Sequence, residues 1–202
     1  MAALGETLRV QRWDDHRYYH HSRINQSLHF FSAVCFVISY VLLLVDPPLA
    51  ALVAWLLSMV SRQAGHFFFE PRTYDEINQA THDHKEDIKV GYNLQRKRVL
   101  MAIWALSPLL LVLDPTLYGL FEPATGIVDF AHHVGWIWLF IGVAGLLFRV
   151  LQLFVQQGFV EGIAWAFKIL TDPFHDIKLY HRAPLALLRG ELIDPMHARH
   201  HD

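Results

Sequence analysis

Long apolar runs separated by short polar segments dominate the pattern of this chain. A helix rises about 1.5 Å per residue, so a run of roughly 20 apolar residues covers the hydrocarbon core of a bilayer, about 30 Å thick. The sequence Asp46-Pro47-Pro48 ends the first run, because proline lacks an amide donor and restricts the residue before it. The pattern predicts four membrane-spanning helices, at about 27–45, 49–69, 99–113 and 134–155.

A fifth apolar segment, residues 159–170, is too short to span and carries Glu161 and Lys168. It is typical of an amphipathic helix that lies in the membrane interface. The composition agrees with this interpretation, since 53% of the residues are hydrophobic, above the share usual in soluble domains. We therefore expect an all-α fold, an integral membrane bundle of about four helices forming one domain over residues 1–202.

The distribution of lysine and arginine predicts the orientation of this bundle. Both residue types occur before the first span, between the second and third, and after the fourth, whereas residues 114–133 contain neither. Short loops rich in these residues stay in the cytoplasm, so we expect both termini and the central loop on the cytoplasmic side. The membrane would be a bacterial inner membrane or the endoplasmic reticulum, and the pattern does not choose between them. The oligomeric state is likewise open.

The charge and cysteine content exclude some classes of function. With 17 Lys and Arg against 19 Asp and Glu, the chain has no overall basic field to attract nucleic acid. A single cysteine, Cys35, excludes an intramolecular disulfide and a cysteine-rich zinc site. The 14 histidines are an excess for this length, and together with carboxylates they are the side chains left to hold a metal.

The first group of these histidines precedes and enters the first span. His20 and His21 are adjacent, and His21, Asn25 and His29 follow at intervals of four residues, which places them on one face of a helix. His29 would lie within the apolar zone, where a polar group is expensive and usually functional. The alternative is a simple hydrogen bond from His29 to a neighbouring helix.

A second group occupies the cytoplasmic end of the second span. Arg62, His66 and Glu70 recur at intervals of four and share one face. Two facing helices would then present histidines at one depth. The alternative is an ion-pair network between Arg62 and Glu70 that His66 merely joins.

The loop that follows alternates histidines with acidic residues. His82 and His84 stand among Asp83, Glu86 and Asp87, and nitrogen and oxygen ligands of this kind suit a first-row metal. A solvated charged loop would show the same pattern. The candidate metal ligands are His20, His21, His29, His66, His82 and His84. Imidazole and carboxylate without thiolate favour iron over zinc or manganese, and Asn25 and Glu70 are candidates for fixing the imidazole tautomers.

The other histidines are weaker candidates. The predicted topology puts His132 and His133 at the opposite membrane face and so argues against them, whereas His175 and His181 lie on the correct side. The spacing His-x-x-His-His at 197–201 also occurs in membrane hydroxylases and desaturases, and His16 with His20 gives His-x-x-x-His. We attribute these two spacings to chance.

The first two groups together resemble the Mpo-like family, membrane proteins that act as Fe(II)-dependent 2-hydroxy fatty acid dioxygenases in lipid alpha-oxidation. The similarity covers roughly the first third of the chain. It lies in two motifs, Tyr19-His20-His21 with Asn25 and His29, and Gly65-His66 with Phe69-Glu70 and Arg72.

The resemblance implies Fe(II) as cofactor and removal of the carboxyl carbon of a 2-hydroxy fatty acid with O2. The acyl chain would lie in the bilayer and the head group near the iron, where Arg62, Glu70 and Asn25 are the candidate active-site residues beside the ligands. Arg62 or Arg72 could bind the carboxylate. Two alternatives stay open: a di-iron lipid hydroxylase or desaturase, and a non-catalytic membrane protein that binds metal or acts as a scaffold.

Overall fold

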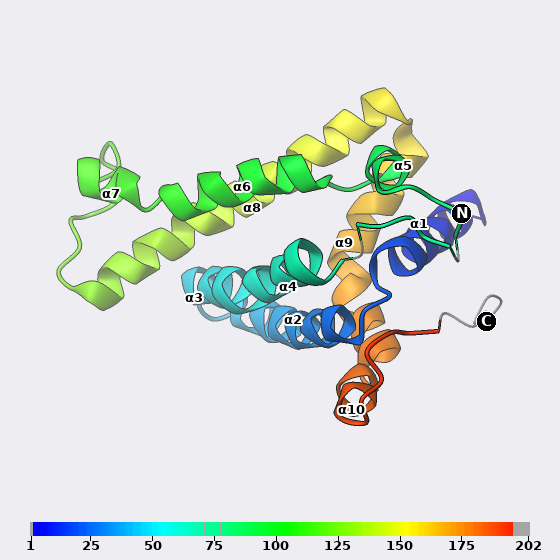
Figure 1. Cartoon of the computed structure of the whole chain (residues 1–202). Coiled ribbons are helices and arrows are strands. Elements are labelled where there is room, and N and C mark those ends of the chain that lie inside the picture. Colours follow the sequence, from blue (N-terminus) through cyan, green and yellow to red (C-terminus); the bar gives the residue numbers. More distant parts are fainter. Residues whose placement is uncertain (1, 71, 77, 196–202) are drawn as a thin grey trace.

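The computed structural model describes residues 2–70, 72–76 and 78–195, and in these residues it is built from helices (Figure 1). The chain begins with α1 (Ala2–Tyr19), which the apolar pattern did not predict. After a short connector, α2 (Arg23–Leu42) starts at Ser22, whose side chain accepts a hydrogen bond from the amide of Asn25. This cap satisfies one of the free amides of the first turn.

The predicted hairpin of the first two spans is present. Asp46 caps α3 (Pro47–Val53) by accepting a hydrogen bond from the amide of Leu49. The helical path then continues without a break through η1 (Ala54–Met59), α4 (Val60–Ala64) and η2 (Gly65–Phe69), of which η1 and η2 are π-helical. Ser32 of α2 and Ser58 of η1 join the two arms through hydroxyls 2.8 Å apart.

A second hairpin extends away from the first. It consists of α6 (Leu94–Leu106), α7 (Leu109–Leu113) and the long α8 (Ile127–Gln156), with α6 lying alongside α8 (Figure 1). A break at Ser107 and Pro108 divides the predicted third span into α6 and α7, whereas the predicted fourth span lies within α8. Tryptophans dominate the packing between the hairpins, where the ring of Trp55 lies 4.2 Å from that of Trp104 and 5.6 Å from that of Trp138.

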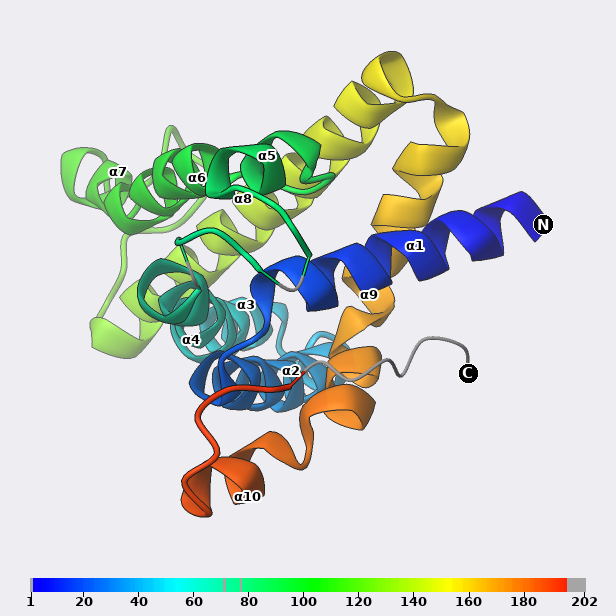
Figure 2. The same cartoon turned by 45° about the vertical axis from the view of Figure 1, so that its right-hand side comes forward.

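The helix α9 (Phe159–Tyr180) crosses the molecule and packs against α1, α2 and α8 (Figure 2). The interfacial helix predicted at 159–170 was too short, because in the structure the helix continues through Pro173 to Tyr180. After α10 (Ala183–Leu188) the chain returns to the start of α2, where the amide of Arg23 donates to the carbonyl of Leu192 at 2.9 Å.

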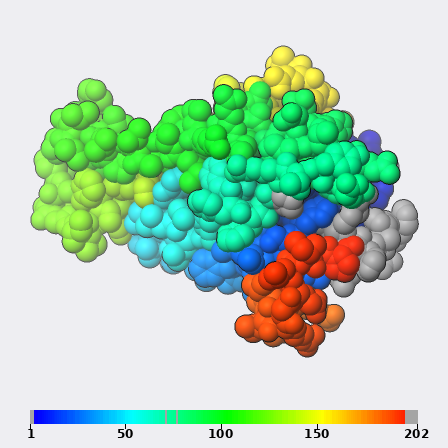
Figure 3. Space-filling model, in the orientation of Figure 1, coloured from blue at the N-terminus to red at the C-terminus, as the bar shows by residue number. Residues whose placement is uncertain are grey.

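The segment between η2 and α6, which includes α5 (His82–Ile88), lies over the end of α1 on the face shown in Figure 3. Lys85 is buried there, and its backbone carbonyl accepts a hydrogen bond from the hydroxyl of Tyr19. Its ammonium lies 2.8 Å from a carboxylate oxygen of Asp75. The hydroxyl of Tyr19, together with a hydrogen bond from Nζ of Lys85 to the carbonyl of Tyr18 at 3.4 Å, holds the segment against α1.

Two described helices, α2 and α8, are long and apolar enough to cross a membrane. Many large apolar side chains along α8 face outward, among them Phe140, Leu147, Phe148, Leu151 and Val155. The described residues form helices and no strands, so the predicted all-α fold is confirmed. The arrangement in four spans stays a prediction.

Candidate metal centre

His20 lies in the connector between α1 and α2, where local hydrogen bonds fix the backbone. The side-chain amide of Gln26 donates to the carbonyl of His20, and that of Asn25 donates to the carbonyl of Tyr19, each at 2.8 Å. The amide of Asp194 donates to the carbonyl of His21 at 2.8 Å. The start of α2 and the C-terminal segment thus determine where the ring of His20 lies.

His66 comes from a π-helical segment pressed against α2. Its neighbour Gly65 lies so close to α2 that a Cβ atom there would be 2.1 Å from the side-chain oxygen of Asn25. Glycine is therefore required for the helices to approach at this depth. Wider π-helical turns often occur at functional sites, and here the turn carries His66 towards His29, which lies two turns into α2.

The rings of these three histidines converge in the interior. His20 and His29 have ring centroids 4.1 Å apart, His29 and His66 4.9 Å, and His20 and His66 5.4 Å. One nitrogen of each ring lies within 4.8 Å of the others, and the residues are 4%, 0% and 8% exposed. The site is therefore a closed cluster of imidazoles contributed by the α1–α2 connector, α2 and η2.

The hydrogen bonding of the cluster fits a metal. Among the described residues, Nε2 of His20 and both ring nitrogens of His29 are buried without a hydrogen-bond partner. Buried polar atoms are rarely left in this state unless a ligand, water or ion satisfies them. Burial, followed by the charge of His29, keeps the pKa of His20 well below its usual range, so this imidazole is neutral, as metal binding requires.

Two of the three rings have a hydrogen-bond partner at Nδ1, and a carboxylate lies near Nδ1 of the third. The hydroxyl of Tyr180 lies 2.8 Å from Nδ1 of His20, and a carboxylate oxygen of Glu70 lies 2.6 Å from Nδ1 of His66. A carboxylate oxygen of Asp176 lies 3.7 Å from Nδ1 of His29. Histidines that bind metals usually donate their other ring N–H to such groups, so the contacts at Nδ1 of His20 and His66 leave the Nε2 atoms of these two rings available to an ion.

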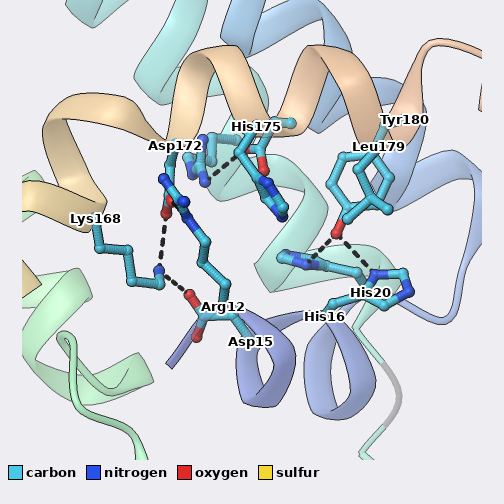
Figure 4. Close-up of a pocket in the computed structure, with 11 residues that line it drawn as sticks. Arg12, Asp15, His16, His20, Lys168, Asp172, His175, Leu179 and Tyr180 are labelled. Atoms are coloured by element: carbon cyan, nitrogen blue, oxygen red, sulfur yellow. Dashed lines mark hydrogen bonds and ion pairs between the residues drawn. The ribbon is translucent and has the colours of Figure 1, made fainter. Parts of the chain in front are cut away.

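A network of ion pairs borders the cluster on the side of α1 and α9. It surrounds a cavity of about 10 Å³, room for one water molecule. Figure 4 shows Lys168 between Asp15 and Asp172, and the Nζ of Lys168 lies 2.8 Å from Asp172. Arg62 also lines this cavity and is paired with Asp176 at 2.9 Å. The cations of this wall are thus balanced by carboxylates.

The remaining residues predicted for the site lie outside the cluster. His21 contacts the carbonyl of Arg17 and lies 3.4 Å from Asp75. His82 and His84 belong to α5, and neither joins the group of three in the described part of the chain. Asn25 donates to the carbonyl of Tyr19 and lies against Gly65. Glu70 contacts His66, and its role in fixing the tautomer stays a prediction. The structure thus brings together three of the six predicted ligands.

The weaker candidates also separate. His132 lies 3.6 Å from Asp46 and His133 3.8 Å from Asp129, near the end of the α6–α8 hairpin remote from α1. His175 lines the polar cavity, and His181 is exposed. The spacing at 197–201 lies outside the described residues.

Sequence reasoning missed three residues that complete the site: His16, Asp176 and Tyr180. The interval of four between Asp176 and Tyr180 places both on one face of a helix. That signal was present in the sequence, but the predicted helix stopped before it. His16 was noted only for its spacing from His20, and its position on α1 depends on a helix that the apolar pattern did not show.

The fold and site together define a helical protein with a buried three-histidine candidate metal centre and two helices that could span a membrane. No family model, curated protein or solved structure matches the chain. The resemblance to the Mpo-like family accordingly rests on the motif residues quoted above.

Proposed function

We propose that this protein is an Fe(II)-dependent membrane dioxygenase that shortens 2-hydroxy fatty acids by one carbon. The observation that supports this proposal best is the convergence of His20, His29 and His66, with unsatisfied nitrogens buried between them. These are three of the four histidines in the two motifs of the family resemblance, and His21 is the fourth. Imidazole ligands without thiolate are compatible with iron.

The surroundings of the cluster suit a lipid substrate. His29 lies near the start of α2, one of the two helices long and apolar enough to cross a membrane. A fatty acid whose chain lies among apolar helices would place its carboxylate and 2-hydroxyl near the polar end of α2. The buried histidines would then meet the head group at the boundary between apolar and polar surroundings.

The proposed reaction balances without an external reductant. A 2-hydroxy fatty acid and one O2 give a fatty acid shorter by one carbon, one CO2 and one water. The bond between C1 and C2 breaks, C1 leaves as CO2, and C2 becomes the new carboxyl carbon. The two carbons lose four electrons in total, and the four-electron reduction of O2 accepts them. Iron would supply the site at which both substrate oxygens and O2 meet.

The carboxylate of this substrate requires a cation. Arg62 is already paired with Asp176 at 2.9 Å, and Arg72 is exposed and donates to the carbonyl of Phe67. Lys97 in the first turns of α6 interacts electrostatically with His66 and has no ion-pair partner within 4.0 Å among the described residues. Burial, and then the charge of Lys89, lowers the pKa of Lys97 to about 7, and the charges of Glu70 and Asp15 offset only part of this shift. An anion beside this lysine would compensate the cost of its charge, so we favour Lys97 for the carboxylate.

The number of metal-binding groups supports a mononuclear centre over the di-iron alternative. The described residues contain one group of three histidines or carboxylates close enough to share an ion. A di-iron hydroxylase would need a second set. A non-catalytic metal-binding role would use the same three histidines, so the distinction depends on turnover.

The test is oxygen consumption by detergent-purified protein loaded with Fe(II) under anaerobic conditions. We expect one O2 consumed per 2-hydroxy fatty acid, with the acid one carbon shorter as product, across a series of chain lengths. His29→Ala and His66→Ala should lose both iron and turnover. His181→Ala, which changes an exposed histidine at the end of α9, is the matched control.

Each result has a distinct meaning. Stoichiometric iron without oxygen consumption would reject the dioxygenase and leave the metal-binding role. Iron content near two per chain would favour the di-iron class. Iron that is retained when His29 and His66 are both changed would reject the three-histidine centre itself.

A further inference from the structure

The hydroxyl of Tyr180 lies between two imidazoles (Figure 4). It is 2.8 Å from Nδ1 of His20 and 3.0 Å from Nδ1 of His16. A tyrosine hydroxyl carries one proton, so it donates to one of these nitrogens and accepts from the other. Two arrangements are therefore compatible with the distances, and they differ in the tautomer of His20.

The two tautomers have opposite consequences for the metal centre. If His20 donates from Nδ1, its Nε2 carries a lone pair that faces His29 and His66. If His20 accepts at Nδ1, its Nε2 carries the proton instead and cannot bind a metal. That Nε2 is buried with no hydrogen-bond partner among the described residues, so a proton there would be left without an acceptor, which is unfavourable for a buried donor.

We infer that Tyr180 is a positioning residue for the metal centre: its hydroxyl accepts from Nδ1–H of His20 and donates to Nδ1 of His16. This inference rests on the proposed metal centre and deepens it. The direction of the two hydrogen bonds fixes the Nδ1–H tautomer of His20 before any metal arrives. Helix α1 takes part through His16 and helix α9 through Tyr180, so the tautomer depends on the contact between these two helices.

One further contact supports this direction. Glu70 imposes the same tautomer on a second ring, because a carboxylate at 2.6 Å from Nδ1 of His66 accepts from that nitrogen. His20 and His66 would thus direct Nε2 to the same point.

The first measurement is the tautomer of His20 in metal-free protein, read from ¹⁵N chemical shifts of histidine-labelled protein in detergent. The His20→Gln variant identifies the resonance. We expect Nδ1–H in the wild type and loss of this preference in Tyr180→Phe. The second measurement is the Kd for Zn(II), used as a probe, which we expect to weaken by about 10–100-fold in Tyr180→Phe.

Tyr40→Phe is the matched control. The hydroxyl of Tyr40 donates to the carbonyl of Leu170 on α9 at 3.0 Å, so this variant also removes one tyrosine hydrogen bond to α9. It contacts none of the three ligands and should leave both the tautomer and the Kd unchanged.

An Nε2–H tautomer of His20 in the metal-free wild type would overturn the inference, as would an unchanged Kd in Tyr180→Phe. If Tyr180→Phe does not fold, the wild-type tautomer still decides. Neither measurement uses lipid or O2. A failure of the dioxygenase proposal would therefore show in the turnover assay while the tautomer result stands.

Discussion

The hydroxyl of Tyr180 lies 2.8 Å from Nδ1 of His20, although 160 residues separate the two in the chain. Asp176, one turn earlier on α9, faces His29 at 3.7 Å. Helix α9 therefore lies beside two of the three ligands, while the two motifs of the N-terminal part of the chain supply all three. A fragment limited to that hairpin would contain the ligands without two of the groups that orient them.

Replacing Gly65 with alanine should disturb the centre without changing a ligand. The added Cβ would lie 2.1 Å from the side-chain oxygen of Asn25, and Asn25 holds the carbonyl of Tyr19 next to His20. We expect Gly65→Ala to lower the free energy of unfolding by about 1–3 kcal/mol and to weaken metal binding. Thermal unfolding in detergent and a metal titration measure the two effects.

The matched control is Gly145→Ala. A Cβ there would lie 4.0 Å from a methyl group of Leu100, an ordinary contact. Because Gly145 lies on α8, away from the histidines, metal binding should not change. Equal metal affinity in Gly65→Ala and the wild type would show that the approach of η2 to α2 does not control the cluster.

The sequence predicted the local part of the site and not its distant part. The interval of four residues in the first motif and the short hairpin between the motifs were enough to place His29 opposite His66. They did not select His20 over His21, because the choice depends on where α1 ends and the connector begins. Tyr180 and Asp176 were missed because the predicted helix stopped before them, and because their interval of four does not show that their face meets the start of α2.

The helices were likewise predicted only in part from the sequence. Hydrophobic length predicted α2 and α8 directly. It did not predict the π-helical turns of η1 and η2, which arise where the second arm packs against α2, or the division at Pro108. Helix α1 was missed because its polar surface carries no apolar run, and its position follows from contacts with α9.

Replacing Lys97 with methionine should weaken substrate binding. The lysine has no ion-pair partner within 4.0 Å among the described residues, although the charges of Glu70 and Asp15 act on it from further away. A hydrogen bond to a charged group contributes about 1.5–3 kcal/mol, and we expect KM for the 2-hydroxy fatty acid to rise by roughly 10–100-fold. Iron content should stay unchanged. Lys178→Met, on the exposed surface of α9, is the control, and a KM unchanged in Lys97→Met would remove Lys97 from the site.

The buried pair of Asp75 and Lys85 predicts an acid-dependent loss of stability. Burial alone would raise the pKa of Asp75, but hydrogen bonds from Lys85 and Asn78 outweigh it and lower the pKa from 3.8 to about 2. The carboxylate is therefore favoured in the folded state, and its contribution is complete above pH 3.8 and lost as the pH falls towards 2. Roughly half of it should be lost by about pH 3.

The variant Asp75→Asn tests this contribution, because it leaves the buried ammonium of Lys85 without its carboxylate. We expect the free energy of unfolding at pH 7 to fall by about 3 kcal/mol, and the difference from the wild type to shrink below pH 3.8. Asp14→Asn removes a partly exposed pair with Arg17 and should cost less than about 1 kcal/mol. A difference in Tm between Asp75→Asn and the wild type that is constant from pH 7 to pH 3 would contradict the assignment.

The number of spans can be measured with single cysteines, because Cys35 is the sole cysteine in the chain. In a Cys35→Ser background, Glu122→Cys and Asp83→Cys would each place a thiol at an exposed position, one near the end of the α6–α8 hairpin and one in α5. With four spans and a cytoplasmic N-terminus, a membrane-impermeant maleimide should label Glu122→Cys and spare Asp83→Cys in intact cells. If neither arm of the α6–α8 hairpin crosses the membrane, both positions lie on the same side and label alike. The same experiment also determines on which side of the membrane the histidine cluster lies, because α5 and the cluster both contact the end of α1. Labelling of Asp83→Cys in intact cells would place the cluster at the outer face and contradict the cytoplasmic site.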